Sequence, residues 1–269
     1  MPTNPNCLNC NKLLRSDDSF CSSCGQKTAI HRLTLHDLLH DTIHYFTHAD
    51  KGIFHLLKEL ARKPGKVARA YVDGTRKKYF NPLNFLLIVA GVVVFMTAVF
   101  SESTLSSSRR STSSGNTVTA PLTPEEQKMY AEMGQRIVKV NKFFAKYANL
   151  VSILATPLFA FLFWLFYFRN KLNYTEHLVA NMYFVGFILL FYALIFIPLK
   201  FWLDDLVMIG FFVFEGIYRG IGYYQFIGRK GTWPLTKALL ISFFLGGLWI
   251  AGTTFVIAVY IRTGFKDLF

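Results

Sequence analysis

The sequence lacks the short motifs by which many enzymes are recognised. It contains no P-loop, no Gly-x-Ser-x-Gly elbow and no dinucleotide fingerprint. It also lacks an early apolar run: the first one starts near Leu83, whereas an export signal places its apolar core within about 30 residues of the N-terminus. We therefore expect a cytosolic N-terminal segment, and we favour a protein that is not an enzyme.

Acidic residues are scarce as well. The chain has 16 Asp plus Glu against 29 Lys plus Arg, which gives a net charge of +13. Such a surplus suits either a nucleic-acid partner or a membrane protein, because membrane proteins collect Lys and Arg on their cytoplasmic side. The composition favours the membrane, since 52% of the residues are hydrophobic and they lie in long unbroken runs.

Five of these runs are long enough to cross a bilayer, which needs about 20 apolar residues in a helix. They are 83–100, 148–168, 178–199, 206–227 and 238–261. The fourth is the weakest, because it contains two charged residues and several glycines. We therefore predict an all-α membrane protein, a bundle of four or five transmembrane helices.

The basic residues predict the orientation of this bundle. Lys and Arg are in excess on the side that carries the N-terminus, and Arg76, Lys77 and Lys78 stand directly before the first span. The positive-inside rule then predicts a bacterial cytoplasmic (inner) membrane protein with a cytosolic N-terminus. Five spans would put the C-terminus outside, whereas a re-entrant fourth segment would return it to the cytosol.

The segment 101–147 is then an outside loop. It begins with a Ser/Thr-rich linker and continues as an amphipathic helix. Thr123 is the predicted N-cap, Pro124 the first helical residue, and Glu126 completes a capping box. This helix either lies at the outer interface and packs on the bundle, or simply extends the second span.

All four cysteines fall in one window, as Cys7-x-x-Cys10 and Cys21-x-x-Cys24-Gly25-Gln26. Two such knuckles complete a tetrahedral, all-thiolate site, which is typical of structural Zn²⁺ in zinc-ribbon-like modules. Gly25 stands where a knuckle needs a positive φ. Zinc is the predicted cofactor; an iron centre, two disulfides and nucleic-acid binding by the knuckle are the disfavoured alternatives.

A stripe of histidines follows the cysteines at helical spacing: His36, His40, His44 and His48. Residues four apart share one helix face, and Asp37 and Asp41 lie beside the stripe. The stripe is either the polar face of an amphipathic cytosolic helix, or a second metal site on His36, His40 and His44. A metal-dependent lipid-modifying enzyme that uses His36 to His48 is the least favoured function.

Two further sets of charged residues are candidate sites. Basic side chains approach the first span with aromatic residues between them, a pattern that indicates contact with anionic lipid headgroups or merely topogenic charge: Arg62, Lys63, Lys66, Arg76, Lys77 and Lys78. Glu215 and Arg219 stand four residues apart inside the fourth span. Charges at membrane depth are costly, so they form either a structural pair near the inner interface or part of a transport path.

The motifs Arg62-Lys63-Pro64-Gly65-Lys66 and Tyr71-Val72-Asp73-Gly74-Thr75-Arg76-Lys77-Lys78-Tyr79-Phe80-Asn81-Pro82 resemble an uncharacterised bacterial membrane family, the domain of unknown function 3667. Members of that family also have a Cys-x-x-Cys…Cys-x-x-Cys-Gly-Gln knuckle and several apolar spans. Thr75 departs mildly from the pattern, where Lys is expected. The resemblance implies the architecture and carries no activity.

The sequence thus predicts a zinc-knuckle module at 1–30, His-rich and basic cytosolic helices at 31–82, and a transmembrane region at 83–269. We favour a membrane scaffold or adaptor that binds an unknown cytosolic protein and anionic membrane lipids, with a homo-oligomer possible. A small transporter or channel that uses Glu215 and Arg219 is the alternative.

Overall fold

A computed structural model describes residues 4–30, 32–38, 52–108, 123–200 and 204–264. These residues form helices and no strand; two isolated β-bridges lie in the N-terminal module. The helices are α2 (Gly52–Arg62), α3 (Pro64–Val72), α4 (Pro82–Ser108), α5 (Pro124–Phe166), α6 (Tyr174–Phe191), the π-helix η2 (Tyr192–Phe196), α7 (Ile197–Lys200), α8 (Asp204–Ile227) and α9 (Thr232–Thr263).

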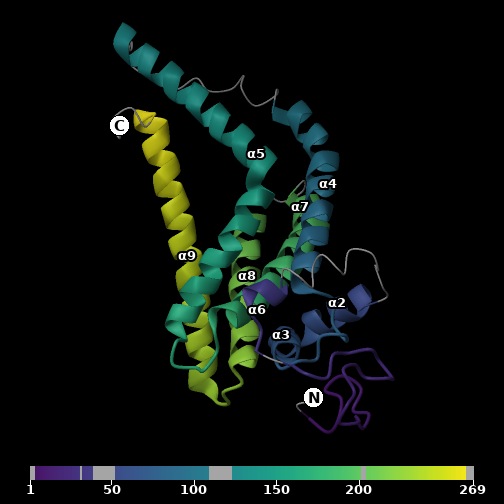
Figure 1. The fold of residues 1–269 in the computed structure, drawn as a ribbon. Helices are drawn as coiled ribbons and strands as arrows, with labels where there is room; N and C mark the ends of the chain where they lie inside the picture. Colours follow the sequence, from purple (N-terminus) through teal and green to yellow (C-terminus); the bar gives the residue numbers. More distant parts are fainter. Residues whose placement is uncertain (1–3, 31, 39–51, 109–122, 201–203, 265–269) are drawn as a thin grey trace.

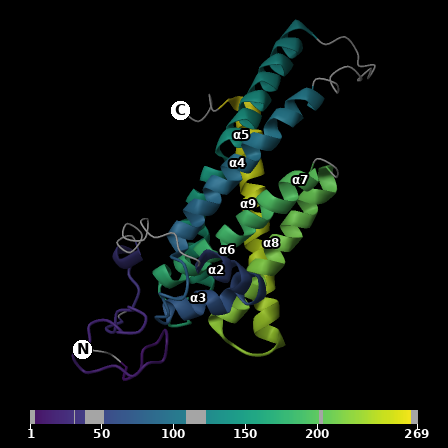
Figure 2. The same ribbon diagram turned by 90° about the vertical axis from the view of Figure 1, so that its right-hand side faces the viewer.

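The long helices lie alongside one another as a bundle (Figure 1). In this bundle α6, η2 and α7 follow one another without a gap and form one continuous helical segment. The N-terminal module and the C-terminus lie at opposite ends of this bundle, and the 90° view agrees (Figure 2). We call the two ends the module end and the far end. The helices α2 and α3 lie beside the module end, where α3 packs against α6 and α8.

Among the described residues, three helices are long and apolar enough to cross a membrane: Pro82–Phe100, Tyr174–Leu199 and Thr232–Thr263. They support a membrane protein by length and composition, and they coincide with the first, third and fifth predicted spans. The second span appears as a shorter apolar helix, Leu150–Phe166. The fourth forms α8, which is not among these candidates. A total of four or five spans therefore stays a prediction.

The start of α5 follows the predicted capping box. The Glu126 amide donates to Thr123 Oγ1 at 3.3 Å, and the Thr123 amide donates to a Glu126 carboxylate oxygen at 2.8 Å. That backbone bond lowers the pKa of the Glu126 carboxyl. The helix then continues through Pro157 to Phe166 without a break. The amphipathic segment is therefore a helical extension of the apolar segment, as one of the two predicted alternatives states.

A break at Lys63 separates α2 from α3, and Pro64 is the first residue of α3. It allows Gly65 to approach α8 so closely that an added Cβ would overlap the carbonyl oxygen of Gly222. The Gly65 amide also donates to Gln225 Oε1 at 3.2 Å, and the Tyr218 hydroxyl donates to the Leu60 carbonyl at 3.0 Å. The glycine is needed here because one helix backbone rests on another.

Candidate metal centre and bundle polar cluster

The N-terminal module consists of two knuckles with the same backbone pattern. In the first, the Asn11 amide donates to the Cys7 carbonyl at 2.8 Å; in the second, the Gly25 amide donates to the Cys21 carbonyl at 2.8 Å. Both turns end at a positive φ, 63° at Asn11 and 69° at Gly25. The sequence predicted this conformation only for Gly25. Asn is the non-glycine residue that tolerates it best, so the same turn forms twice.

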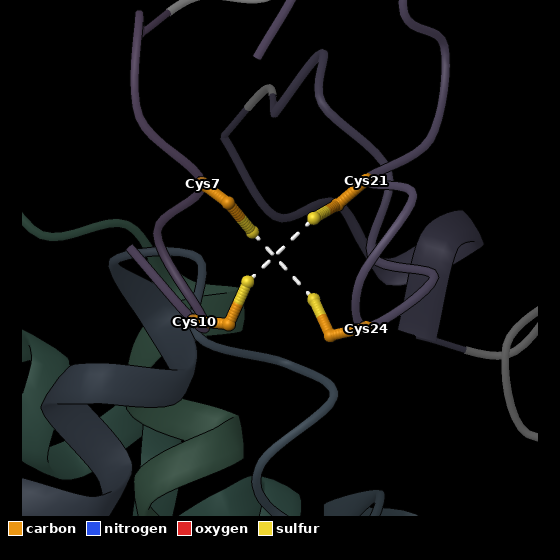
Figure 3. A group of neighbouring side chains, drawn as sticks. All are labelled: Cys7, Cys10, Cys21 and Cys24. Atoms are coloured by element: carbon orange, nitrogen blue, oxygen red, sulfur yellow. Dashed lines mark hydrogen bonds between the residues drawn. The ribbon is translucent and has the colours of Figure 1, made fainter. Parts of the chain in front are cut away.

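The two knuckles bring the four cysteine sulfurs together (Figure 3). All four Sγ atoms lie within 4.8 Å of one another. The cross-knuckle pairs Cys7–Cys24 and Cys10–Cys21 are each 3.6 Å apart. Tetrahedral Zn–S bonds of about 2.3 Å would place the sulfurs about 3.8 Å apart, whereas a disulfide needs about 2.05 Å. The cysteines are free, and their spacing fits a four-coordinate metal ion.

The thiols differ in their surroundings. The backbone amides of Ser23 and Cys24 donate toward Cys21 and lower the pKa of its thiol to about 6. Burial raises the pKa of Cys7 to about 11. Burial raises the pKa of the Cys24 thiol, but hydrogen bonds from the Gln26 backbone and the Asn9 side chain lower it, and the net effect is a lowered pKa. A divalent cation would favour the thiolate form of all four ligands, because its charge outweighs the cost of burial.

The module is docked on the turn that leads into α4. The buried side chain of Gln26 donates to the Gly74 carbonyl at 2.6 Å and accepts from the Lys77 amide at 3.3 Å. The Thr75 hydroxyl adds a bond to the Leu8 carbonyl at 3.3 Å. Gln26 is the residue after the second knuckle, so the metal site and the membrane-proximal turn share one polar contact.

Gly74 makes this docking possible. Its φ is +112°, and a Cβ there would lie 2.9 Å from Ile30 Cδ1 and 3.0 Å from Leu8 Cδ1. Any larger residue would be strained in its backbone and would press against the module. The Asp-Gly-Thr-Arg-Lys-Lys motif that carries the family resemblance is therefore also the surface on which the cysteine module rests.

A second attachment joins the chain after the module to the bundle, and no sequence pattern pairs these two segments. The Arg32 guanidinium donates to both carboxylate oxygens of Glu176, at 2.9 and 3.1 Å. Glu176 is buried at the start of α6, where it also caps that helix with Asn173. This bond to Glu176 raises the pKa of Arg32. The Asn173 amide group donates to the Leu33 carbonyl at 3.2 Å and completes the attachment.

The predicted histidine site lies mostly outside the described residues. His40, His44 and His48 fall there, whereas His36 is exposed on a short helical stretch, 35–38. Within the described residues, the four cysteines are the only group of three or more potential metal ligands. A second metal site and catalysis by this stripe stay untested predictions.

The basic residues proposed for lipid contact lie on the α2–α3 junction and on the turn before α4. Arg76 is half-buried, and the other five are exposed: Arg62, Lys63, Lys66, Lys77 and Lys78. Lys78 also lies over the ring of Tyr79, 5.3 Å from its centroid. The structure thus places both parts of this segment beside the module end (Figure 1).

Glu215 and Arg219 form the predicted ion pair on α8. The Arg219 side chain is only 6% exposed, and its guanidinium lies 4.6 Å from the ring centroid of Phe159 on α5. It is held inside the bundle by the carboxylate on one side and an aromatic face on the other. Arg219 is eight residues from the end of α8, roughly 12 Å along the helix, so the pair lies nearer the module end than the far end.

Three further polar residues lie close to this pair, and we call all five the bundle polar cluster: Glu215, Arg219, Tyr223, Asn181 and His177. The Asn181 amide group donates to the Tyr223 hydroxyl and to the His177 carbonyl. Tyr223 stacks on Phe163, with centroids 3.8 Å apart, and His177 stacks beside Tyr223. Sequence reasoning did not point to Asn181 or Tyr223.

Several atoms of the bundle polar cluster are buried without a hydrogen-bond partner in the described part of the chain. They are both ring nitrogens of His177, Oδ1 of Asn181 and Nε of Arg219. Buried polar atoms are almost always satisfied, by protein or by water. The cluster therefore has unused capacity to bind water or a polar ligand.

Residues 50–94 match the model of a known family, and no curated protein and no solved structure matches the chain. The matched segment runs from the start of α2 into α4, so it contains the basic residues, Gly65 and the turn under the module. The cysteine module precedes it. The family that this segment matches is described as "Protein of unknown function (DUF3667)".

Proposed function

We propose that this protein is a membrane scaffold or adaptor that presents a zinc knuckle at the cytoplasmic surface of the inner membrane. The observation that carries the proposal is the Gln26 contact, which fixes the metal module to the turn entering the first membrane-length helix. A four-cysteine site has no open coordination position, so its zinc is structural and not catalytic. The module then serves as a rigid surface for a partner.

The exposed face of the module supports a protein partner. Leu13 is 74% exposed and Phe20 is 55% exposed, and neither is used in docking to the Gly74 turn. Exposed large apolar residues on so small a domain favour association with another protein. The surrounding charges are mixed, with Lys12 and Arg15 near Asp17 and Asp18, which argues against nucleic acid as the partner.

Anionic lipid is the second proposed partner. The exposed basic residues of the α2–α3 junction and of the turn at Lys77 and Lys78 lie beside the module end, as do the loops that contain Arg169, Lys171, Arg229 and Lys230 (Figure 1). Each basic residue close to an anionic surface contributes about 1 kcal/mol of attraction. This shared location supports a cytosolic module end by the positive-inside rule.

The test is affinity purification in mild detergent with two matched double variants. Leu13→Asp/Phe20→Asp should lose specific co-purifying proteins and still bind zinc. Ser16→Asp/Ser29→Asp adds the same charge at two exposed polar positions of the module, and it should retain those proteins. If the apolar double variant keeps the same partners as the wild type, the adaptor proposal fails.

A small transporter or channel is the second candidate, and the bundle polar cluster is the observation that favours it. The buried atoms of His177, Asn181 and Arg219 that lack partners could bind a polar solute or a file of water. The cluster lies between α6 and α8, with Phe159 of α5 covering Arg219. In this alternative the cysteine module would regulate the bundle through the Gly74 turn.

A further inference from the structure

A cavity lies between α5 and α9, away from the cysteine module, and its lining residue Phe159 also covers Arg219. Its volume is about 830 Å³, within the usual range of small-molecule sites. Its walls are aliphatic and aromatic side chains such as Phe143, Leu158 and Trp249. The proposed function makes no use of this groove.

Two contacts join the helices that form the groove. Toward the module end, the rings of Phe159 and Trp249 are in contact, with centroids 5.6 Å apart. Toward the far end, Arg136 donates to the carbonyls of Ile261 and Arg262, at 3.0 Å each, and so caps the end of α9. These contacts hold α5 and α9 at a fixed separation, so the groove is built into the fold.

The charge along the groove is strongly asymmetric. Among its lining residues only Lys139 is charged, and it lies one turn from Arg136 at the far end. Glu132 pairs with Arg136 at 3.4 Å, whereas the described ion pairs leave Lys139 without an acidic partner. Tyr260 lines the same end, and a tyrosine near a terminal arginine is typical of a membrane–water interface.

We propose that this groove binds one anionic phospholipid, with its phosphate at Lys139 and an acyl chain against the apolar walls. From Lys139 to Leu158 the lining extends roughly 28 Å along α5, which exceeds the depth of one leaflet, about 15 Å, and so accommodates an acyl chain whose phosphate lies at Lys139. The polar atom of Thr253 is already bonded to the Trp249 and Ile250 carbonyls. The walls therefore offer an acyl chain a surface without unsatisfied polar groups.

Charge complementarity favours a lipid over a second copy of the chain. A phospholipid has one negative head and a long apolar tail, which matches one cation at one end of an apolar groove. The apolar helices of a second copy would leave Lys139 without a counter-charge. The proposed site contains none of the basic residues at the module end, and its one cation, Lys139, lies in the half of α5 that is remote from them.

Two glycines of α9 provide a filling variant and its control. A Cβ on either Gly252 or Gly247 would have nothing within 4 Å, but only Gly252 lines the groove. Gly252→Leu should therefore fill the groove without disturbing the helix contacts, and Gly247→Leu adds the same side chain outside it. Lys139→Gln removes the cation, and Lys128→Gln is its control on the same helix, outside the groove.

The experiment is native mass spectrometry of the full-length protein, stripped of lipid in detergent and titrated with phosphatidylglycerol or phosphatidylcholine. The wild type, Gly247→Leu and Lys128→Gln should each hold one phosphatidylglycerol in preference to phosphatidylcholine. Gly252→Leu should lose this adduct. Lys139→Gln should keep the adduct but lower the preference by about fivefold, the effect of one basic residue on an anionic lipid.

Two results would overturn the proposal. The first is lipid binding that is equal in Gly252→Leu and Gly247→Leu, or that does not depend on lipid charge in the wild type. The second is a dimeric wild type that becomes monomeric in Gly252→Leu, which would make the groove an interface between copies. Neither result bears on the adaptor proposal, because the Leu13→Asp/Phe20→Asp variant leaves the groove intact.

Discussion

The docking of the cysteine module can be tested by replacing Gln26 with leucine. The buried Gly74 carbonyl accepts a 2.6 Å bond from this side chain and a 2.9 Å bond from the Arg76 amide, so Gln26→Leu removes one of its two bonds. One such bond contributes about 0.5–1.5 kcal/mol net. The Lys77 amide belongs to an exposed residue and its bond is long, at 3.3 Å, so water can replace that bond at little cost. We expect the docked state to lose about 1 kcal/mol.

That loss corresponds to about a fivefold rise in the undocked fraction. The rate of backbone amide hydrogen exchange rises with the fraction of molecules in which the module is undocked. Mass spectrometry of the full-length protein in detergent should therefore show faster exchange in peptides covering 70–80 and 20–30. The zinc content should not change, because the Gln26 carbonyl, which accepts from the Cys21 amide at 2.8 Å, is retained.

Lys27→Gln is the matched control, since Lys27 is exposed and adjacent to Gln26 in the chain. Its exchange should equal that of the wild type. The docking argument is refuted if Gln26→Leu also exchanges like the wild type. It is equally refuted if Gln26→Leu loses its metal, because the side chain would then support the knuckle and not the contact with the turn.

The other predictions concern the bundle. Gly65→Ala should destabilise the protein by about 1–3 kcal/mol, because the new Cβ would press on the α8 backbone; Gly134→Ala, which meets nothing within 4 Å, should leave the melting temperature in detergent unchanged or raised. If the protein is a transporter, Glu215→Gln and Arg219→Met should each abolish the cellular phenotype while the protein still reaches the membrane, since breaking a buried pair costs about 3–5 kcal/mol; if both variants work normally, that candidate is excluded. Reporter fusions should place residue 232 on the same side of the membrane as the module and residue 112 on the other; the reverse arrangement for either would contradict the topology.

Features set by short-range chemistry could be predicted from the sequence. The capping box at Thr123, the break before Pro64 and the ion pair on α8 each depend on residues within four positions of one another. The cysteine spacing likewise predicted the four metal ligands, because two Cys-x-x-Cys knuckles that bind one ion supply two thiolates each. The positive φ of Asn11 could also have been found, since Asn11 follows its cysteine pair as Gly25 follows the second pair.

Contacts between distant segments could not be predicted. Gln26 and Gly74 are 48 positions apart, and Arg32 and Glu176 are 144 apart. No local sequence pattern predicts which turn the cysteine module contacts, because the position of that turn depends on how α3 and α4 pack in the folded protein. For Asn181 a signal did exist: it is a polar residue inside an apolar run, and such residues in membrane helices usually face the bundle. Its partner Tyr223 carried no such signal.

The metal content of the purified full-length protein tests the central claim most directly. Elemental analysis should find about one Zn²⁺ per chain, as a single four-thiolate site requires. The double variant Cys21→Ser/Cys24→Ser should lose this metal and still insert into the membrane, because its apolar helices are unchanged. Iron in place of zinc, or a wild-type protein without metal, would contradict the account.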